Sequence, residues 1–236
     1  MTLHMIELLP TRRALLRFLD REGLLDFKRF DLGYGVHAWL QAAFGHLAPT
    51  PFRIFLRRDG TVQVLGYSGA DAEKLRERLE AFADPVVFEI CPPDRIASRP
   101  MPRFSKGRCL GFEVLCCPVA RRTEDGKTIE KDVFLARCDR HGGETPLRRA
   151  VVYAEWLREK LDGAAELVEM TVMGFKLQRL LRKTQGGSRQ KRWLQRPEAL
   201  FSGTLLVSDG EAFARLLRRG IGRHRAFGYG MLLLKP

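Results

Sequence analysis

His37 is the residue of this chain whose position best suits proton transfer at neutral pH. It lies three residues after Tyr34, in an apolar-periodic segment whose stripe is Val36, Leu40, Ala43, Phe44 and Leu47. At about 100° per residue, a helix places His37 at the margin of this stripe and Tyr34 further toward the polar side. An imidazole has a pKa of about 6.5 and can both take and give protons near pH 7. The spacing predicts an imidazole that a substrate can reach, although ordinary boundary histidines occupy the same kind of position.

A basic stretch between Lys176 and Pro197 is suited to binding phosphate. It contains eight basic residues and no acidic one: Lys176, Arg179, Arg182, Lys183, Arg189, Lys191, Arg192 and Arg196. Gly186, Gly187 and Ser188 lie at its middle and predict a long basic hairpin or a flexible basic loop. Because solvated surfaces usually mix charges of both signs, the run favours contact with nucleic-acid phosphates. Such contacts position a nucleic acid without reading its bases.

Residues 220–230, the glycine-rich segment, contain four glycines in eleven positions. Backbone N–H groups at Gly220 and Gly222 can approach a phosphate closely, and Arg223 and Arg225 add positive charge. A sharp connection between a helix and a strand is the competing explanation of the same glycines. We therefore treat these four residues as candidate phosphate ligands.

The charge balance indicates a polyanionic partner. The chain of 236 residues is 45% hydrophobic, and 41 Lys and Arg against 28 Asp and Glu give a net charge of +13. Nucleic acid is the first candidate, and an anionic membrane surface is the second. No apolar run approaches the roughly 18 residues needed to span a bilayer, and we see no signal-peptide pattern. We expect a globular cytoplasmic protein with no membrane partner.

The cysteines and histidines show no spacing typical of metal ligands. The five cysteines include no Cys-x-x-Cys pair, and the five histidines are scattered. We expect the five cysteines to be reduced and buried, with no disulfide framework. No metal and no cofactor is expected, so hydrolytic chemistry here would be metal-free.

The first half of the chain predicts a β-α-β-β-α-β order. Asp59-Gly60 joins two strand-like runs as a hairpin signal. The expected strands are 3–9, 52–58, 61–67 and 86–90, and the expected helices are 14–19, 34–47 and 70–82. This order is the ferredoxin-like plan.

Four prolines over residues 92–102 disfavour a helix or a central strand and predict a linker. Beyond it we expect strands at 109–117, 131–136, 167–177, 199–207 and 227–234, a turn at Asp125-Gly126, and a helix around Val152, Trp156 and Leu161. Ser208 and Glu211 have the spacing of a capping box before a last helix. The predicted class is α+β, with tandem ferredoxin-like (RRM-like) domains and antiparallel sheets: 1–91, a Pro-rich linker 92–108, and 109–236.

Taken in order along nearly the whole chain, these motifs resemble the CasE family, the repeat-processing endoribonucleases of subtype I-E Cascade. Tyr34-x-x-His37 is similar to the family's Tyr/Leu-x-x-His helix, and the glycine-rich segment is similar to its terminal signature. The Trp156-Leu157 pair resembles a family helix as well. The resemblance assigns a catalytic role to His37 and a supporting role to Tyr34.

Two positions depart from the family pattern. Glu113 and Leu115 replace the arginines usual in the middle strand, and Arg223-His224-Arg225 replaces a Pro-Ala-Lys segment. The phosphate contacts of that strand are therefore not expected here. His224 becomes a second candidate for acid-base chemistry.

The resemblance implies binding of a CRISPR repeat RNA hairpin, cleavage at its base, and retention of the crRNA hairpin as the protein joins other Cascade subunits. It also implies metal-independent attack by a ribose 2′-hydroxyl, leaving a 2′,3′-cyclic phosphate. His37 would move a proton in this reaction, as acid or base, and the basic stretch would contact the stem. The alternatives are a catalytically inactive RNA-hairpin-binding subunit of the same fold and, more distantly, a DNA-binding protein.

Overall fold

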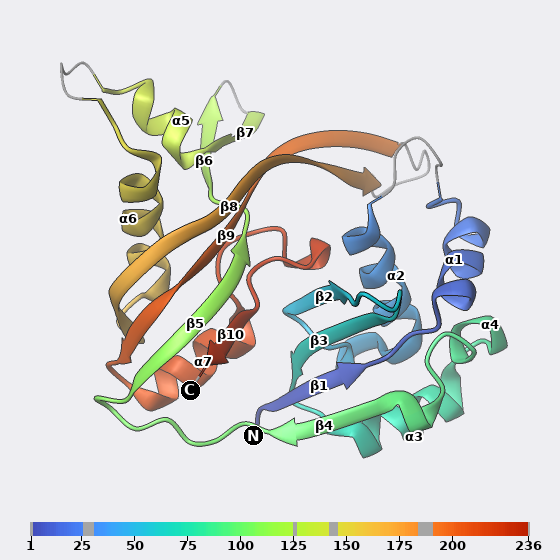
Figure 1. The fold of residues 1–236 in the computed structure, drawn as a ribbon. Helices are drawn as coiled ribbons and strands as arrows, with labels where there is room; N and C mark the ends of the chain where they lie inside the picture. Colours follow the sequence, from blue (N-terminus) through green and yellow to red (C-terminus); the bar gives the residue numbers. More distant parts are fainter. Residues whose placement is uncertain (1, 26–30, 125–126, 142–145, 184–190, 236) are drawn as a thin grey trace.

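A computed structural model of the chain describes residues 2–25, 31–124, 127–141, 146–183 and 191–235 (Figure 1). Two four-stranded antiparallel sheets form the two halves of the molecule, and a two-stranded sheet is added to the second half. Each large sheet has its helices on one face (Figure 1). The predicted α+β class with antiparallel sheets is confirmed.

The first sheet has the strand order β2-β3-β1-β4, which is the ferredoxin-like arrangement. Its strands are β1 (His4–Leu8), β2 (Phe52–Leu56), β3 (Val62–Ser68) and β4 (Ile96–Pro100). Its helices are α1 (Arg12–Arg21), α2 (Leu32–Phe44), α3 (Ala72–Phe82) and the short α4 (Pro85–Phe88), with 3-10 turns at Gly45–Leu47 and Pro93–Arg95. The predicted helix that carries His37 is therefore present as α2.

Two expectations for this half are wrong. The strand expected at 86–90 is the helix α4, because the Asp84 side chain accepts a hydrogen bond from the Val86 N–H and Pro85 begins the helix. The fourth strand is β4, which pairs with β1 from His4↔Pro100 to Leu8↔Ile96. The linker expected over 92–108 is thus wrong for residues 96–100. A proline is tolerated there because β4 is an edge strand.

The second sheet repeats the arrangement, with the strand order β10-β5-β9-β8. Its strands are β5 (Cys109–Cys116), β8 (Ala165–Lys183), β9 (Lys191–Val207) and β10 (Leu232–Lys235), and its helices are α6 (Arg149–Leu161) and α7 (Gly210–Arg219). Between β5 and α6 the chain adds the hairpin β6 (Val119–Glu124) and β7 (Lys127–Asp132), the helix α5 (Val133–Cys138), and the last 3-10 turn is Arg225–Phe227.

Three local expectations in this half need correction. Residues 131–136 are not a strand throughout, because Asp132 ends β7 and caps α5 by accepting from the Phe134 N–H. Asp209, rather than Ser208, caps α7. The last strand begins at Leu232 instead of residue 227, since the 3-10 turn occupies Arg225–Phe227. The turn predicted at Asp125-Gly126 lies outside the described residues.

The long β8–β9 hairpin connects the two halves. It leaves the second sheet and bends toward α1 and α2 of the first half (Figure 1). Leu181 of β8 is 3% exposed and belongs to the core of the first half, against which Trp193 of β9 also packs. The basic stretch is therefore held by both halves of the molecule.

Candidate functional site

The amino-terminal end of α2 is fixed by Asp31, which is 6% exposed. Its Oδ1 accepts from the Tyr34 N–H at 3.0 Å, which caps the helix, and its Oδ2 accepts from the Leu181 N–H of β8 at 2.9 Å. Burial raises the pKa of Asp31, against the lowering effect of these hydrogen bonds. One carboxylate thus ties the start of the helix that carries His37 to the basic hairpin.

His37 lies in the second turn of α2 and is half-buried. Its Nδ1 is buried and has no hydrogen-bond partner among the described residues. Burial lowers the pKa of His37 below its usual value. The imidazole is therefore mainly neutral at pH 7, and Nε2 is the ring nitrogen left to face a substrate.

The glycine-rich segment packs directly on this end of α2. The Tyr34 ring lies between the rings of His37 and Phe227, at centroid distances of 6.4 and 5.6 Å. A Cβ on Gly33 would approach the Phe227 carbonyl oxygen to 2.2 Å, so only glycine permits this contact. The structure brings Tyr34 and His37 together with the carboxyl-terminal segment, 190 residues away along the chain.

A carboxylate that is 10% exposed, Glu130 of β7, holds the glycine-rich segment from the other side. Its Oε1 accepts from Arg223 Nε at 2.6 Å, and its Oε2 lies 2.8 Å from His224 Nε2 and 3.2 Å from Arg196 Nε. The hydrogen bond to His224, with the charge of Arg223, lowers the pKa of Glu130 to about 2. Sequence reasoning missed Glu130, because its partners lie 66 to 94 residues away.

His224, the second acid-base candidate, belongs to this cluster. Its ring packs against Phe227 at a centroid distance of 5.7 Å, while Nε2 faces Glu130. Phe227 and Tyr34 thus lie between the two histidine rings in a chain of ring contacts. The arrangement gives His224 a role in holding the segment.

The candidate phosphate ligands Gly220 and Gly222 have local structural roles. Both adopt positive φ, +74° and +75°, and a Cβ would approach Pro51 at one and Trp156 at the other to about 3 Å. The Gly220 N–H already donates to the Leu216 carbonyl at the end of α7. The alternative explanation, a tight helix-to-strand connection, therefore accounts for both glycines.

The basic stretch is a hairpin whose pairing extends to Lys183↔Lys191. The backbones of Arg182 and Arg192 face each other in this pairing, whereas Arg189 lies outside the described residues. Arg179 is exposed on β8, and Lys176 forms an ion pair with Glu198 at 3.0 Å. Arg196 is 16% exposed and faces Glu130, so the structure gives it a partner inside the protein.

The departure at Glu113 has a structural partner in the first half of the chain. Arg53 of β2 donates to Glu113 Oε1 at 3.2 Å, and Lys235 of β10 donates to Oε2 at 3.2 Å. The carboxylate that replaces a family arginine therefore joins the two sheets. Leu115, the other replacement, packs against a small apolar cluster that includes Tyr229 and Leu180.

The described residues contain no cluster of three or more metal-ligating side chains. No helix in the described part of the chain is long and apolar enough to cross a membrane.

The model of the family described as "CRISPR associated protein" matches residues 3–236. The chain belongs to this CRISPR-associated family. The family assignment made from the sequence motifs is thereby confirmed, whereas no curated protein matches the sequence.

Solved structures show the fold that this CRISPR-associated protein shares. It is similar to Thermus thermophilus Cse3 bound to an RNA representing a pre-cleavage complex, with 20% identity, a TM-score of 0.63 and 100% of both chains covered. It is similar to Cas6e from Escherichia coli K-12, with 17% identity, a TM-score of 0.56 and 100% of both chains covered. A chain of a CRISPR RNA-guided surveillance complex matches with 17% identity, a TM-score of 0.62 and 98% of each chain covered.

Proposed function

We propose that this protein is an endoribonuclease that binds the hairpin of a CRISPR repeat transcript. The RNA would be cut at the base of the hairpin, next to His37. One observation carries the proposal: the end of α2 with Tyr34 and His37 contacts the glycine-rich segment through Phe227, and Asp31 joins it to the basic hairpin. A proton-transfer group and two cationic segments, drawn from distant parts of the chain, thus meet in one place. Cse3, which has the same fold, is bound to RNA in its solved complex.

In the proposed reaction the ribose 2′-oxygen attacks the adjacent phosphorus, and the bond from phosphorus to the 5′-oxygen breaks. The products are a 2′,3′-cyclic phosphate and a 5′-hydroxyl, and no metal ion takes part. Since burial lowers the pKa of His37, we assign it the role of general base, which takes the 2′-hydroxyl proton on Nε2. Water supplies the proton that the leaving 5′-oxygen gains. Tyr34 supports the imidazole through its ring contact.

We propose that the basic hairpin binds the RNA stem. An A-form stem has a deep and narrow major groove, so a protein holds it mainly by its shape and backbone. Arg179, exposed on β8, is the contact best supported by the described side chains, and the paired backbone at Arg182 and Lys183 extends the hairpin further. The charge of +13 favours such a contact.

We also propose that the protein remains on the cleaved hairpin as a subunit of an RNA-guided surveillance complex in the cytoplasm. The support is the shared fold with a chain of such a complex, which matches over 98% of each chain. The proposed partners are thus the repeat RNA, its mature crRNA product and the neighbouring subunits.

His37→Ala tests the catalytic assignment, and His46→Ala is its matched control, because His46 is exposed in the 3-10 turn that follows the helix of His37. We expect cleavage of a repeat RNA by His37→Ala to fall by about 10² to 10⁴, the usual contribution of a positioned acid or base. Binding of the hairpin should remain, and His46→Ala should cut normally. A single 2′-deoxy nucleotide at the cleavage position should also abolish cutting, and EDTA should not.

Unchanged cleavage by His37→Ala would remove His37 from the reaction. Tight hairpin binding without any cleavage by the wild-type protein would instead leave the alternative, a catalytically inactive RNA-binding subunit. Preference for duplex DNA over the RNA hairpin would contradict the proposal altogether.

A further inference from the structure

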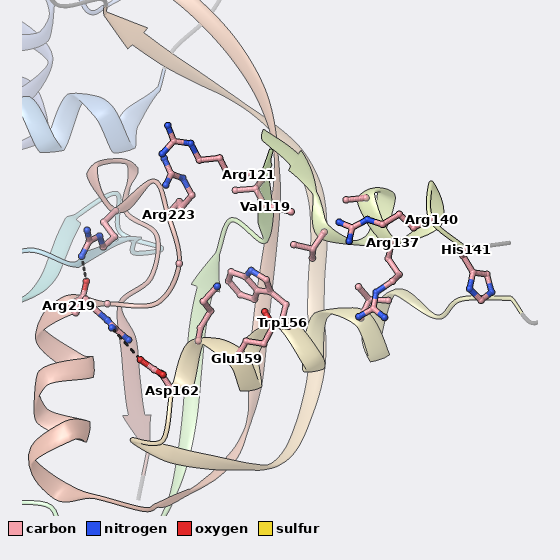
Figure 2. Close-up of a pocket in the computed structure, with 18 residues that line it drawn as sticks. Val119, Arg121, Arg137, Arg140, His141, Trp156, Glu159, Asp162, Arg219 and Arg223 are labelled. Atoms are coloured by element: carbon pink, nitrogen blue, oxygen red, sulfur yellow. Dashed lines mark hydrogen bonds and ion pairs between the residues drawn. The ribbon is translucent and has the colours of Figure 1, made fainter. Parts of the chain in front are cut away.

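A cavity of about 1030 Å³ lies on the side of the glycine-rich segment away from α2 (Figure 2). Its walls come from β6, α5, α6 and the glycine-rich segment. Figure 2 shows Trp156 of α6 between the segment that carries Arg223 and the helix that carries Arg137. No role assigned above to His37 or to the basic hairpin uses this cavity.

The side chains around the cavity are strongly cationic. Seven arginines and lysines line it, against two carboxylates, Glu159 and Asp162. Arg223 is already held by Glu130 at 2.6 Å. Arg137 pairs with Glu155 at 2.7 Å, and Arg219 lies 3.8 Å from Asp162. The last two pairs are largely exposed and therefore weak, so an incoming phosphate can compete for Arg137 and Arg219. The excess of positive charge favours an anionic ligand.

The floor of the cavity differs from its rim. Trp156 is 5% exposed and has its Nε1 buried without a hydrogen-bond partner among the described residues. Val152 and Ala136 lie beside it, and both are buried. An apolar floor under a cationic rim suits a nucleotide whose base lies inside and whose phosphates meet the arginines.

The position of the cavity relates it to His37. Arg223 and Arg225 line the cavity, whereas Phe227, two residues further on, packs against Tyr34. The glycine-rich segment therefore separates the cavity from Tyr34, and a ribonucleotide chain bound at His37 would reach the cavity by crossing this segment. The volume lies at the upper end of ordinary ligand sites, about 300 to 1,000 Å³, which suits a few nucleotides.

We propose that this cavity binds the single-stranded repeat RNA that flanks the hairpin. The proposal rests on the proposed function, because it assumes that an RNA is cut beside His37. The flank adds cationic contacts that the stem cannot reach, and it places the strand in a fixed path across the glycine-rich segment. The 5′ and 3′ flanks share the same chemistry, so the experiment below separates them.

The test uses the double variant Arg140→Gln/Lys160→Gln, which removes two positive charges from the cavity. The matched control is Lys106→Gln/Arg158→Gln, which removes two charges from exposed positions that do not line it. Fluorescence anisotropy would measure binding of four RNAs: the bare hairpin, the hairpin with either flank, and the hairpin with both. Each measurement would be repeated over a range of salt concentrations.

We expect the cavity variant to bind a flanked RNA about tenfold more weakly at 0.15 M salt, and to bind the bare hairpin normally. Loss of two phosphate contacts should also reduce the salt slope of the flanked RNA by roughly 1.4, at about 0.7 per contact with a single strand. The flank whose removal abolishes the difference between variant and wild type is the one that the cavity holds.

Equal weakening for the bare hairpin would overturn the proposal, because the cavity would then act on the stem. An unchanged affinity for every RNA would also overturn it and would favour an acidic protein partner at this site. Both results are distinct from a failure of the proposed function, in which the wild-type protein would not bind the bare hairpin or would not cut it.

Discussion

Replacement of Glu130 by glutamine should destabilise the protein by about 3 kcal/mol at pH 7. The carboxylate is 10% exposed and interacts with Arg196, Arg223 and His224, and its pKa is lowered from 4.5 to about 2. Each pKa unit corresponds to about 1.4 kcal/mol of preference for the ionised form in the folded state. Glutamine resembles the protonated carboxyl, so it should lose about this amount. The figure is an upper value, since Arg223 is 48% exposed and can be rehydrated.

Urea unfolding at several pH values measures this contribution. Because the folded-state pKa is depressed, the stabilisation by Glu130 is fully present above about pH 4.5 and is lost as the pH falls toward 2. The difference between wild type and Glu130→Gln should therefore be constant near pH 7 and should shrink below pH 4.5. Glu80→Gln, on the exposed surface of α3, is the control and should change stability by less than about 0.5 kcal/mol. If both variants unfold at the same urea concentration at pH 7, the argument that the ion pairs of Glu130 hold the glycine-rich segment is refuted.

Three further results are expected. The kcat/KM for cleavage should rise with pH through a His37 pKa below 6.5 and then stay level, because the neutral imidazole acts as the base. A kcat/KM that falls from pH 6 to 8 would instead assign His37 as the acid. Gly33→Ala should slow cleavage of the hairpin at least tenfold, since its Cβ would meet the Phe227 oxygen at 2.2 Å. The control Gly174→Ala has open space around its Cβ and should cut normally. Equal cleavage rates for the two variants would show that the contact between Gly33 and Phe227 is dispensable. Asp31→Asn should cost about 1 to 3 kcal/mol in thermal unfolding, because the amide cannot accept from both the Tyr34 and Leu181 N–H groups, and an unchanged melting temperature would contradict that role.

Local sequence signals predicted the elements that depend on local preference. The apolar stripe of α2 and the hairpin across Asp59-Gly60 are both present where the sequence placed them. Residues 86–90 include three β-branched side chains and therefore predict a strand, but Asp84 caps a helix there and Pro85 begins it. Strand β4 was missed because a short edge strand that ends in proline owes its existence to pairing with β1. The clustered basic residues predicted the hairpin, but neither its length nor its docking on the first half.

The sequence by itself determined the partner class and the residues that can do chemistry. Its charge indicated a polyanion, and the order of its motifs placed the chain in a CRISPR-associated family with His37 as the candidate catalytic residue. Only the tertiary structure decided how these pieces meet. Asp31, Glu130 and Phe227 bind partners far away along the chain, and such contacts depend on the packing of two sheets rather than on local preference. That packing sets the direction of the His37 pKa, because burial of the imidazole exists only in the folded protein.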